Sequence, residues 1–461
     1  MEAGSSPPAP PADPPGVPAP VVEGAETGPL SLAEIRDVWP LLAHPDRIQA
    51  FTLLPRDEAE DFFFALPARD QAEVVLGIPA RDQRSWVRSL APDDVADVIQ
   101  AGPMEKRETL LALLDDATRR EVTALLAYSE DNAGGLMNPR YIRLRPEMTV
   151  DEAISYVRKQ MREQPRTIYY GYVLDSDQRL LGVVSFRELF TATFRTRVAE
   201  IMKRQVIAIP EQMDQEAVSH KFAQSHLVAL PVVDTAGVMK GIVTVDDVVD
   251  VVREEATEDM QKVGGVEALD APYLEIELSR MIRKRVGWLC VLFLGEMLTA
   301  SAMSFFEKEI ERAVVLALFI PLIISSGGNS GSQATTLVIR AMALGEIRLK
   351  DWWRVIRREA VSGLGLGLVL AIIGFIRIVL WEGLFHTYGV HYIGIASTVA
   401  ISLLGVVMWG TLAGSMLPFM LRRLGFDPAS ASAPFVATLV DVSGLVIYFS
   451  AAAMILGGTL L

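Results

Sequence analysis

Five apolar stretches in the C-terminal part of the chain constrain its fold more than any other feature. Each is long enough to cross the hydrocarbon core of a bilayer as a helix, which takes roughly 20 apolar residues. A spanning segment must satisfy its own backbone hydrogen bonds, so we expect each to be helical. The stretches run near 286–306, 313–339, 360–381, 393–419 and 434–459.

The loops between these stretches alternate in charge, which predicts the orientation of the spans. Basic residues precede the first stretch and follow the second and fourth, whereas the other two loops are acidic or lack Lys and Arg. Cytoplasmic loops are enriched in Lys and Arg, so we expect the N-terminal part in the cytoplasm and the C-terminus on the opposite side of the cell (inner) membrane. The basic loops carry Arg280, Arg283, Lys284, Arg285, Arg340, Arg348, Lys350, Arg354, Arg357, Arg358, Arg422 and Arg423.

Composition indicates an acidic soluble part joined to this membrane part. The 461 residues have a net charge of −14 although 51% of them are hydrophobic. The negative charge favours cations over nucleic acid as partners. The only cysteine, Cys290, excludes an intrachain disulfide and suits a reducing compartment. No nucleophile–base pair or phosphate-binding loop is visible, so we do not expect an enzyme. Residues 1–29 are Pro-rich, lack a signal-peptide pattern and predict a disordered tail.

Asp441 is the most informative single residue, because it lies within the fifth apolar stretch. Apart from Tyr448 it is the only ionisable side chain between 433 and 461. An Asp at the centre of a spanning helix costs about 2.5–3.5 kcal/mol, and membrane proteins retain such residues mostly where they face a bundle interior or a water-filled path. In such a path a lone carboxylate attracts cations. The alternative is a buried Asp that hydrogen-bonds a neighbouring helix.

The second apolar stretch contains a run of small and polar residues, and here we expect an interruption of the helix. Gly327, Gly328 and Gly331 surround Asn329, and Gln333 follows. Non-helical backbone at this depth is tolerated only where it lines a cavity or is buried in protein. Asn329 and Gln333 supply neutral oxygen ligands that hard cations accept. Tight helix packing through small residues is the alternative, and it explains the glycines better than the two amides.

The soluble part begins with a helical repeat. Prolines recur at intervals of 12, 12 and 13 residues, and each predicts the start of a short helix. Stacked helices of this kind form a superhelical, all-α domain, which we place at 30–135. In the last repeat Asp93 and Asp97 share a helical face, either as cation ligands or as plain solvated surface. The four prolines are Pro55, Pro67, Pro79 and Pro92.

A second repeat aligns residues 173–189 with 232–248 without a gap. Each copy reads as strand, Asp turn, Gly, strand and then a Ser or Thr followed three positions later by an acidic residue, the pattern of a capped helix. The two copies resemble a tandem pair of CBS (cystathionine-β-synthase) domains, an α/β regulatory module that often binds adenine nucleotides. We place the two domains at 136–199 and 200–253.

An acidic helix follows the second copy and leads to the first span. Asp247, Asp250, Glu254 and Glu258 lie on one helical face, and like charges at this spacing repel each other. A multivalent cation would relieve the repulsion; a solvated acidic helix is the alternative. The connecting segment 254–284 is placed where it can couple ion occupancy to the membrane part at 285–461.

The order of acidic helical repeat, CBS pair, connecting helix and five spans resembles the MgtE family of magnesium channels over residues 30–461. Its most specific motifs are FIPLIISSGGNSGSQATTLVIRA in the second span, FDPASASAPFVATLVDVSGLVIY around the fifth, and TVDDVVDVVREEATED before the membrane part. The expected fold is therefore a multi-domain membrane protein: an all-α cytoplasmic superhelical domain, an α/β CBS pair, a connecting helix and an all-α five-span domain.

The resemblance also implies functional residues. It implies a homodimer in the lipid bilayer whose pore is lined by the second and fifth spans, with Mg²⁺ contacts at Asp441, Asn329, Gly328 and the Ala437 carbonyl. It implies ATP as a possible second ligand, near Tyr170, Arg187 and Glu188. The Mg²⁺-sensing residues that it implies are Asp93, Asp97, Asp214, Glu216, Asp246, Asp247, Asp250, Glu255, Glu258 and Asp259.

The function that we expect is Mg²⁺ influx down its electrochemical gradient through a channel that cytoplasmic Mg²⁺ closes. Two alternatives stay open. A CBS-regulated exporter or other transporter of divalent metals would share the regulatory pair. A membrane sensor or scaffold would keep the CBS pair and would not need Asp441.

Overall fold

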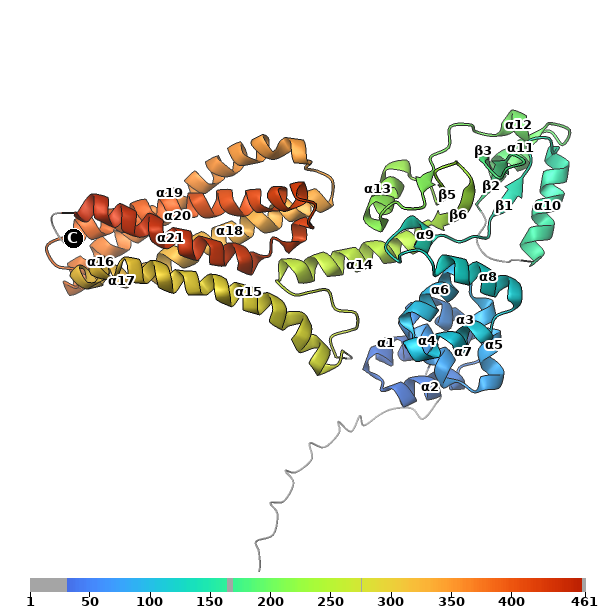
Figure 1. Cartoon of the computed structure of the whole chain (residues 1–461), viewed down its shortest axis with the longest axis horizontal. Helices are drawn as coiled ribbons and strands as arrows, with labels where there is room; N and C mark the ends of the chain where they lie inside the picture. The colour runs from blue at the N-terminus through green and yellow to red at the C-terminus, as the bar shows by residue number, and fades with distance from the viewer. Residues whose placement is uncertain (1–30, 164–168, 275, 458–461) are drawn as a thin grey trace, which may run out of the picture. The chain divides into compact units, whose positions relative to one another are not determined.

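The computed structural model describes residues 31–163, 169–274 and 276–457, so the predicted tail at 1–29 lies outside the described residues. The chain divides into two compact units, Met1–Val248 and Val249–Leu461 (Figure 1). The first unit contains the helical repeat and the CBS pair. The second contains the connecting segment and the spans, and the helix α14 (Val245–Val263) crosses the boundary between them.

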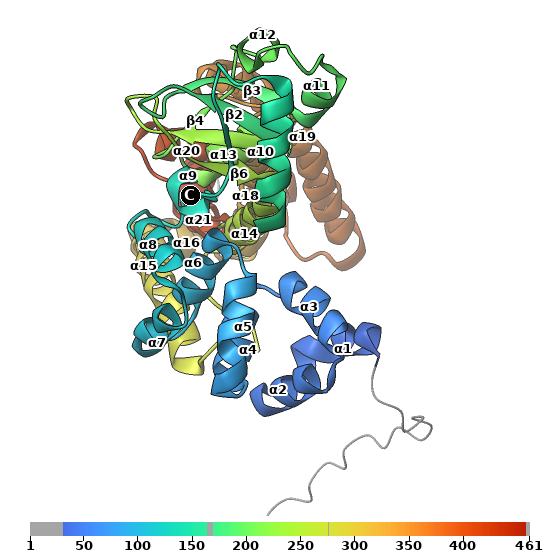
Figure 2. The same ribbon diagram turned by 90° about the vertical axis from the view of Figure 1, so that its right-hand side faces the viewer.

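Short helices form the superhelical domain, as the proline spacing predicts. Pro92 lies in the first turn of its helix, whereas Pro55, Pro67 and Pro79 each stand one position before theirs, at the N-cap. Alternate helices pack on one another, and α4 and α5 run side by side (Figure 2). The helices are α1 (Leu32–Val38), α2 (His44–Leu53), α3 (Arg56–Ala65), α4 (Ala68–Gly77), α5 (Ala80–Ser89), α6 (Pro92–Ala101), α7 (Arg107–Ala112) and α8 (Asp116–Leu125).

Aromatic side chains form the centre of this domain. Phe51, Phe63 and Trp86 are buried, and the ring centroid of Trp86 lies 5.0 Å from the centroids of both phenylalanines. Burial of apolar surface on this scale drives the packing of helices that are each too short to be stable alone.

Each CBS copy contains a three-stranded sheet with the same topology. In the first, β1 pairs with β2 in parallel and β2 with β3 in antiparallel; β4, β5 and β6 repeat this order. The elements are α9 (Ala133–Leu136), β1 (Ile142–Leu144), α10 (Val150–Glu163), β2 (Tyr170–Leu174), β3 (Leu180–Ser185), α11 (Phe186–Thr191), α12 (Val198–Ile201), β4 (Ile209–Pro210), α13 (Gln215–Ser225), β5 (Ala229–Val233) and β6 (Met239–Thr244).

The two copies are joined by the segments that precede them. Asn138, ahead of the first sheet, pairs with Ile242 of β6, whereas Lys203, ahead of the second, pairs with Val183 of β3. Each copy therefore contributes backbone to the other's sheet, which explains why the repeat occurs as a pair.

Among its described residues, the second unit has five segments that are long and apolar enough to cross a membrane, as the sequence predicts. They are Leu278–Phe305, Val314–Ala343, Leu349–Phe385, Tyr392–Arg423 and Ala433–Leu456. The helices are α15 (Leu278–Phe305), α16 (Glu307–Arg312), α17 (Val314–Ala317), α18 (Ile320–Ala343), α19 (Trp352–Phe385), α20 (Tyr392–Arg423) and α21 (Ala433–Leu456).

The expected interruption of the second span is wrong, because α18 is one continuous helix from Ile320 to Ala343. Its glycines serve helix packing instead. A Cβ at Gly327 would lie 2.8 Å from Val440 Cγ1 of α21, and one at Gly331 would lie 2.9 Å from the Gly410 carbonyl oxygen of α20. Small residues at these positions let the three backbones approach closely, so the helix keeps its own hydrogen bonds.

Buried hydroxyl groups connect the same helices. Ser330 and Thr411 hydrogen-bond through their side chains at 2.7 Å, and the Thr335 hydroxyl donates to the Gly414 carbonyl of α20 at 2.8 Å. The contact between α18 and α20 thus combines small residues with satisfied polar groups.

This packing predicts that Gly331→Ala destabilises the membrane unit, because the added Cβ must push α20 or α21 away. Overpacking of this kind costs about 1–3 kcal/mol. We expect a lower midpoint of thermal unfolding for the full chain in detergent. Gly365→Ala on α19 is the matched control, since a Cβ there meets no atom within 4 Å. Equal midpoints for the two variants would contradict the close-packing role.

Candidate cation-binding sites

Asp441 lies on α21 where this helix faces α18. A Cβ at Gly328 would be 3.5 Å from the Ala437 backbone and 3.9 Å from Asp441 Oδ1. The structure therefore brings together Gly328, Ala437 and Asp441, three of the four residues predicted to line a pore. Because Gly328 has no side chain, the half-buried Asp441 carboxylate keeps open space beside it.

Asn329, the fourth residue, lies next to Gly328 on an exposed polar stripe of α18. Its amide donates to the Ser325 hydroxyl one turn earlier, at 3.4 Å. Ser325, Asn329, Gln333 and Thr336 recur at helical spacing and are all exposed in the single chain. Polar groups facing lipid are costly, so this stripe requires water or another polar surface.

Glu296 is a residue that the sequence analysis missed. It lies on α15, is exposed, and is close enough to Asp441 for its charge to act on that carboxylate. An acidic residue inside the first apolar stretch was the available signal, and the same reasoning that singled out Asp441 applies to it.

In the first unit, Asp93 is buried rather than solvated, so the plain-surface interpretation is wrong for this residue. It retains only 7% of its exposure and accepts a hydrogen bond from Asn138 Nδ2 at 3.1 Å. Burial, followed by the charges of Asp247, Asp94 and Asp97, raises the pKa of Asp93 well above its usual value.

Asp247 and Asp93 belong to one acidic cluster, and Asp247 also caps α14. The Thr244 backbone N–H and hydroxyl donate to Asp247 Oδ2 at 3.1 and 2.5 Å. Burial raises the pKa of Asp247 to about 7, against these hydrogen bonds and with the help of the charges of Asp246 and Asp94. The cluster therefore combines carboxyl groups of α6 with carboxyl groups at the start of α14, and these groups repel each other.

The remaining predicted sensing residues lie on or next to three helices, α13, α14 and α6. Asp214 and Glu216 are exposed at the N-terminus of α13, where Asp214 Oδ1 accepts the Glu216 backbone N–H at 3.0 Å. Asp246 and Asp250 are exposed on the first turns of α14, Asp97 is exposed on α6, and Glu255 and Asp259 are half-buried in the second half of α14.

Glu258 is not a lone carboxylate, because Lys262 forms an ion pair with it one turn later on α14. Lys262 Nζ also lies 2.6 Å from Asp427 Oδ2, in the loop before α21. Repulsion along the acidic face is thus partly offset by a lysine. The structure adds Asp427 to this group, and the FDPAS motif was the signal for it.

In the residues that the structure describes, no group of three or more His, Cys, Asp or Glu side chains is positioned to hold a metal ion.

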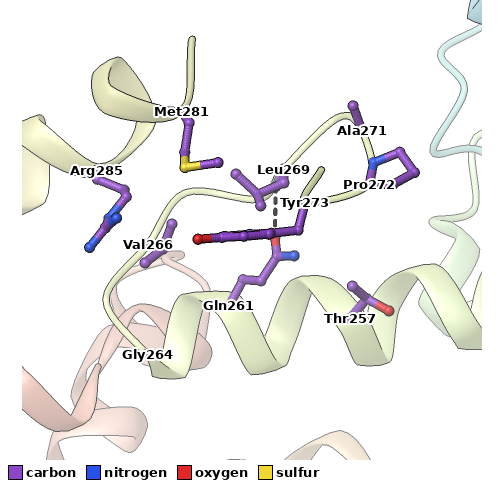
Figure 3. A pocket seen from close by; sticks show the side chains of 10 residues that line it. All are labelled: Thr257, Gln261, Gly264, Val266, Leu269, Ala271, Pro272, Tyr273, Met281 and Arg285. Carbon is purple, nitrogen blue, oxygen red and sulfur yellow. Dashed lines mark hydrogen bonds between the residues drawn. The ribbon is translucent and has the colours of Figure 1, made fainter. Parts of the chain in front are cut away.

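A cavity of about 730 Å³ lies where the connecting segment turns back along α14 (Figure 3). Thr257 and Gln261 of α14 form one wall, and Met281 and Arg285 of α15 lie across from them. The Leu269 backbone N–H donates to Gln261 Oε1 at 2.6 Å, which holds the segment against α14.

The nucleotide candidates gather at the start of α11. Tyr170 is paired with Ser185 across β2 and β3, and the exposed Arg187 lies two residues after Ser185. Glu188 is already engaged, because its carboxylate accepts from Ser185 and lies 2.9 Å from Lys203 Nζ.

The five candidate spans, the carboxylate within the fifth of them and the CBS pair define the class as a multi-pass membrane transporter that carries a CBS pair. Three family models match the chain. The model of the divalent cation transporter MgtE matches residues 320–451, and that of the MgtE intracellular N domain matches 30–131. The CBS domain model matches 133–194 and 198–254. The chain belongs to the MgtE family of divalent cation transporters.

Relatives are similar in sequence to this chain along most of its length. Magnesium transporter MgtE of Thermus thermophilus is 43% identical over 91% of this chain and 92% of its own length. The protein of the same name from Enterococcus faecalis is 33% identical over 72% of this chain and 71% of its own. A solved cytosolic domain of the Mg²⁺ channel MgtE in complex with ATP is 41% identical over 48% of this chain and 90% of that one, with a TM-score of 0.45.

The acidic cluster predicts that stability falls as pH rises. Asp247 has a pKa of about 7 in the folded chain, against about 3.9 for an unperturbed Asp, so the folded state binds more protons between these values. The contribution of Asp247 to the free energy of unfolding is therefore fully present below pH 4 and is lost as the pH rises through 7.

We expect Asp247→Asn to reduce the loss of stability between pH 5 and pH 8 by on the order of 2 kcal/mol. The measurement is thermal unfolding of the full chain with a chelator present, followed by tryptophan fluorescence. Asp116→Asn is the control, since the Asp116 side chain is 95% exposed. A pH dependence unchanged by Asp247→Asn would contradict the cluster's electrostatics.

Proposed function

We propose that this chain is a magnesium channel through which Mg²⁺ enters the cell down its electrochemical gradient. The observation that supports the proposal is the Asp441 carboxylate, which lies within the candidate span α21 and close to Gly328 and Ala437. Relatives named magnesium transporters support the choice of ion. Mg²⁺ gives up water reluctantly, so Asp441 would hold it through its water shell.

The pore proposed here forms between two copies of the chain, with α18 and α21 of each facing the path. The exposed polar stripe of α18 supports this arrangement, because it would then line water instead of lipid. Two copies would contribute two Asp441 carboxylates, a charge that matches one divalent cation. Asn329 and the Ala437 carbonyl would set the width for the hydrated ion.

The driving force proposed is the membrane potential. With the soluble part in the cytoplasm and the C-terminus outside, a negative-inside potential contributes about 2.3 kcal/mol per charge per 100 mV, doubled for a divalent ion. No nucleotide hydrolysis is then needed for influx.

Closure is proposed to follow Mg²⁺ binding to the acidic residues of the soluble part. The sensor would comprise segments 30–135, 136–199 and 200–253. Segment 254–284 would connect the sensor to the pore, and segment 285–461 would form the pore. The repulsion within the Asp93–Asp247 cluster supports this, because a divalent cation relieves it. Mg²⁺ shifts the equilibrium toward the closed state only if that state binds it more tightly.

ATP is proposed as a second ligand of the CBS pair, at Tyr170 and Arg187. Glu188 is better assigned to capping α11, since Ser185 and Lys203 occupy its carboxylate. The exposed guanidinium of Arg187 is suited to phosphate.

The test of the pore is Mg²⁺ uptake into proteoliposomes under a negative-inside potential, with wild type beside Asp441→Asn. We expect wild-type uptake and a reduction of at least about tenfold in the variant, because the neutral amide no longer attracts the ion. Full uptake by Asp441→Asn would remove the carboxylate from the path. No uptake by correctly oriented, folded wild type would favour an exporter or a sensor.

The test of closure is inhibition by Mg²⁺ on the side of the soluble part. The double variant Asp247→Asn with Asp250→Asn is expected to need several-fold more Mg²⁺ for half-inhibition, since two ligand charges are lost. Asp116→Asn should leave the inhibition unchanged. Inhibition of the double variant at the wild-type concentration would contradict the sensor.

A further inference from the structure

Glu296 is an acidic residue within the membrane unit that the proposed pore does not yet explain. It lies inside the first span, and the stretch 286–306 contains no other acidic residue and no Lys or Arg. The side chain is exposed in the single chain. An ionised carboxylate facing lipid at this depth costs several kcal/mol, and membrane proteins retain such a group mainly where it faces a polar path or a partner charge.

Three contacts determine the register of α15 against α21. Trp288 Nε1, within α15, donates to Oγ of Ser432, the N-cap residue of α21, at 3.0 Å. Further along, a Cβ at Gly295 would lie 2.8 Å from Thr438 Cγ2. The two helices therefore run parallel and keep nearly the same register between these two contacts.

At the far end of the two helices, the rings of Phe306 and Phe449 stack with centroids 4.8 Å apart. With Gly295 opposite Thr438, the next residue, Glu296, is level with the turn that leads to Asp441. This register agrees with the electrostatic proximity of the two carboxylates. The geometry therefore places a second negative charge beside the first, from a different helix.

No basic side chain in the facing helices balances these charges. The described parts of α15 after Arg285, of α18 before Arg340 and of α21 contain no Lys or Arg. Arg377 of α19 stacks on Trp381, with its guanidinium carbon 5.2 Å from the ring centroid. Two carboxylates at one depth without a basic partner on these helices attract mobile cations.

We propose that Glu296 is a specificity-determining residue of the cation path, which acts through its charge on ions held at Asp441. This inference rests on the proposed channel function. A fixed negative charge lowers the energy of an ion in proportion to the ion's own charge, so Glu296 favours divalent over monovalent cations. The dimer then presents two Asp441 and two Glu296 side chains to the path.

The experiment compares Glu296→Gln and Glu296→Asp in proteoliposomes, with Mg²⁺ uptake measured over a range of Mg²⁺ concentrations and with K⁺ as competitor. Gln keeps the size and hydrogen-bonding groups of Glu and removes its charge, whereas Asp keeps the charge. We expect Glu296→Gln to raise the half-saturating Mg²⁺ concentration roughly three- to tenfold, with a smaller change in maximal uptake and stronger competition by K⁺. Glu296→Asp should stay within about twofold of wild type in both measurements.

Ser301→Ala, at another exposed polar position on α15, is the matched control and should behave as wild type. A wild-type half-saturating concentration in Glu296→Gln would overturn the inference. Equal impairment of Glu296→Asp and Glu296→Gln would also overturn it, because a packing role would then explain both.

Asp441→Asn, measured in the same assay, separates the two proposals. If it abolishes uptake while Glu296→Gln has no effect, the channel stands and only the role of Glu296 fails. If Asp441→Asn transports as well as wild type, the proposed path itself fails, and the Glu296 inference fails with it.

Discussion

The close approach of α18 to α20 and α21 is the constraint on which the rest of the membrane unit depends. Gly327 and Gly331 leave no room for a Cβ, and the contact extends to the carbonyl of Gly410. Lipid provides little hydrophobic force between helices, so association relies on this backbone proximity and on hydrogen bonds such as Ser330–Thr411. The same approach places Gly328 beside Asp441, so the packing that holds the helices together also forms the candidate ion position.

Carboxyl groups without enough counter-charge recur in both units. In the first, Asp93 and Asp247 are held together at the start of α14 with raised pKa values. In the second, Asp441 and Glu296 lie on parallel helices that carry no nearby basic residue. In each arrangement the negative charges repel each other, and a bound cation would relieve that repulsion. Lys262, between Glu258 and Asp427, is the contrasting case, in which a lysine of the same unit partly offsets the charge of two acidic residues.

Several features were predictable because they depend on local sequence. The spans follow from hydrophobic length, the short helices from their prolines, and the CBS pair from a repeat whose Ser185–Glu188 and Thr244–Asp247 caps form as expected. Three features were not. The second span is an unbroken helix, Asp93 is buried, and Glu296 lies beside Asp441. Each of these depends on which elements pack together, and composition within a single segment does not reveal that.

The sequence by itself determined the class of protein, the number of spans and the acidic residues available to cations, because hydrophobic length, charge and motif spacing are properties of the chain. Tertiary structure alone decided the role of the glycines and the pairing of the carboxylates. A glycine permits both a break in a helix and a close contact, and only the presence of α20 and α21 against α18 selects the contact. Likewise, the pKa of Asp93 is raised because tertiary packing buries this residue and brings carboxylates from other segments, such as Asp247, beside it.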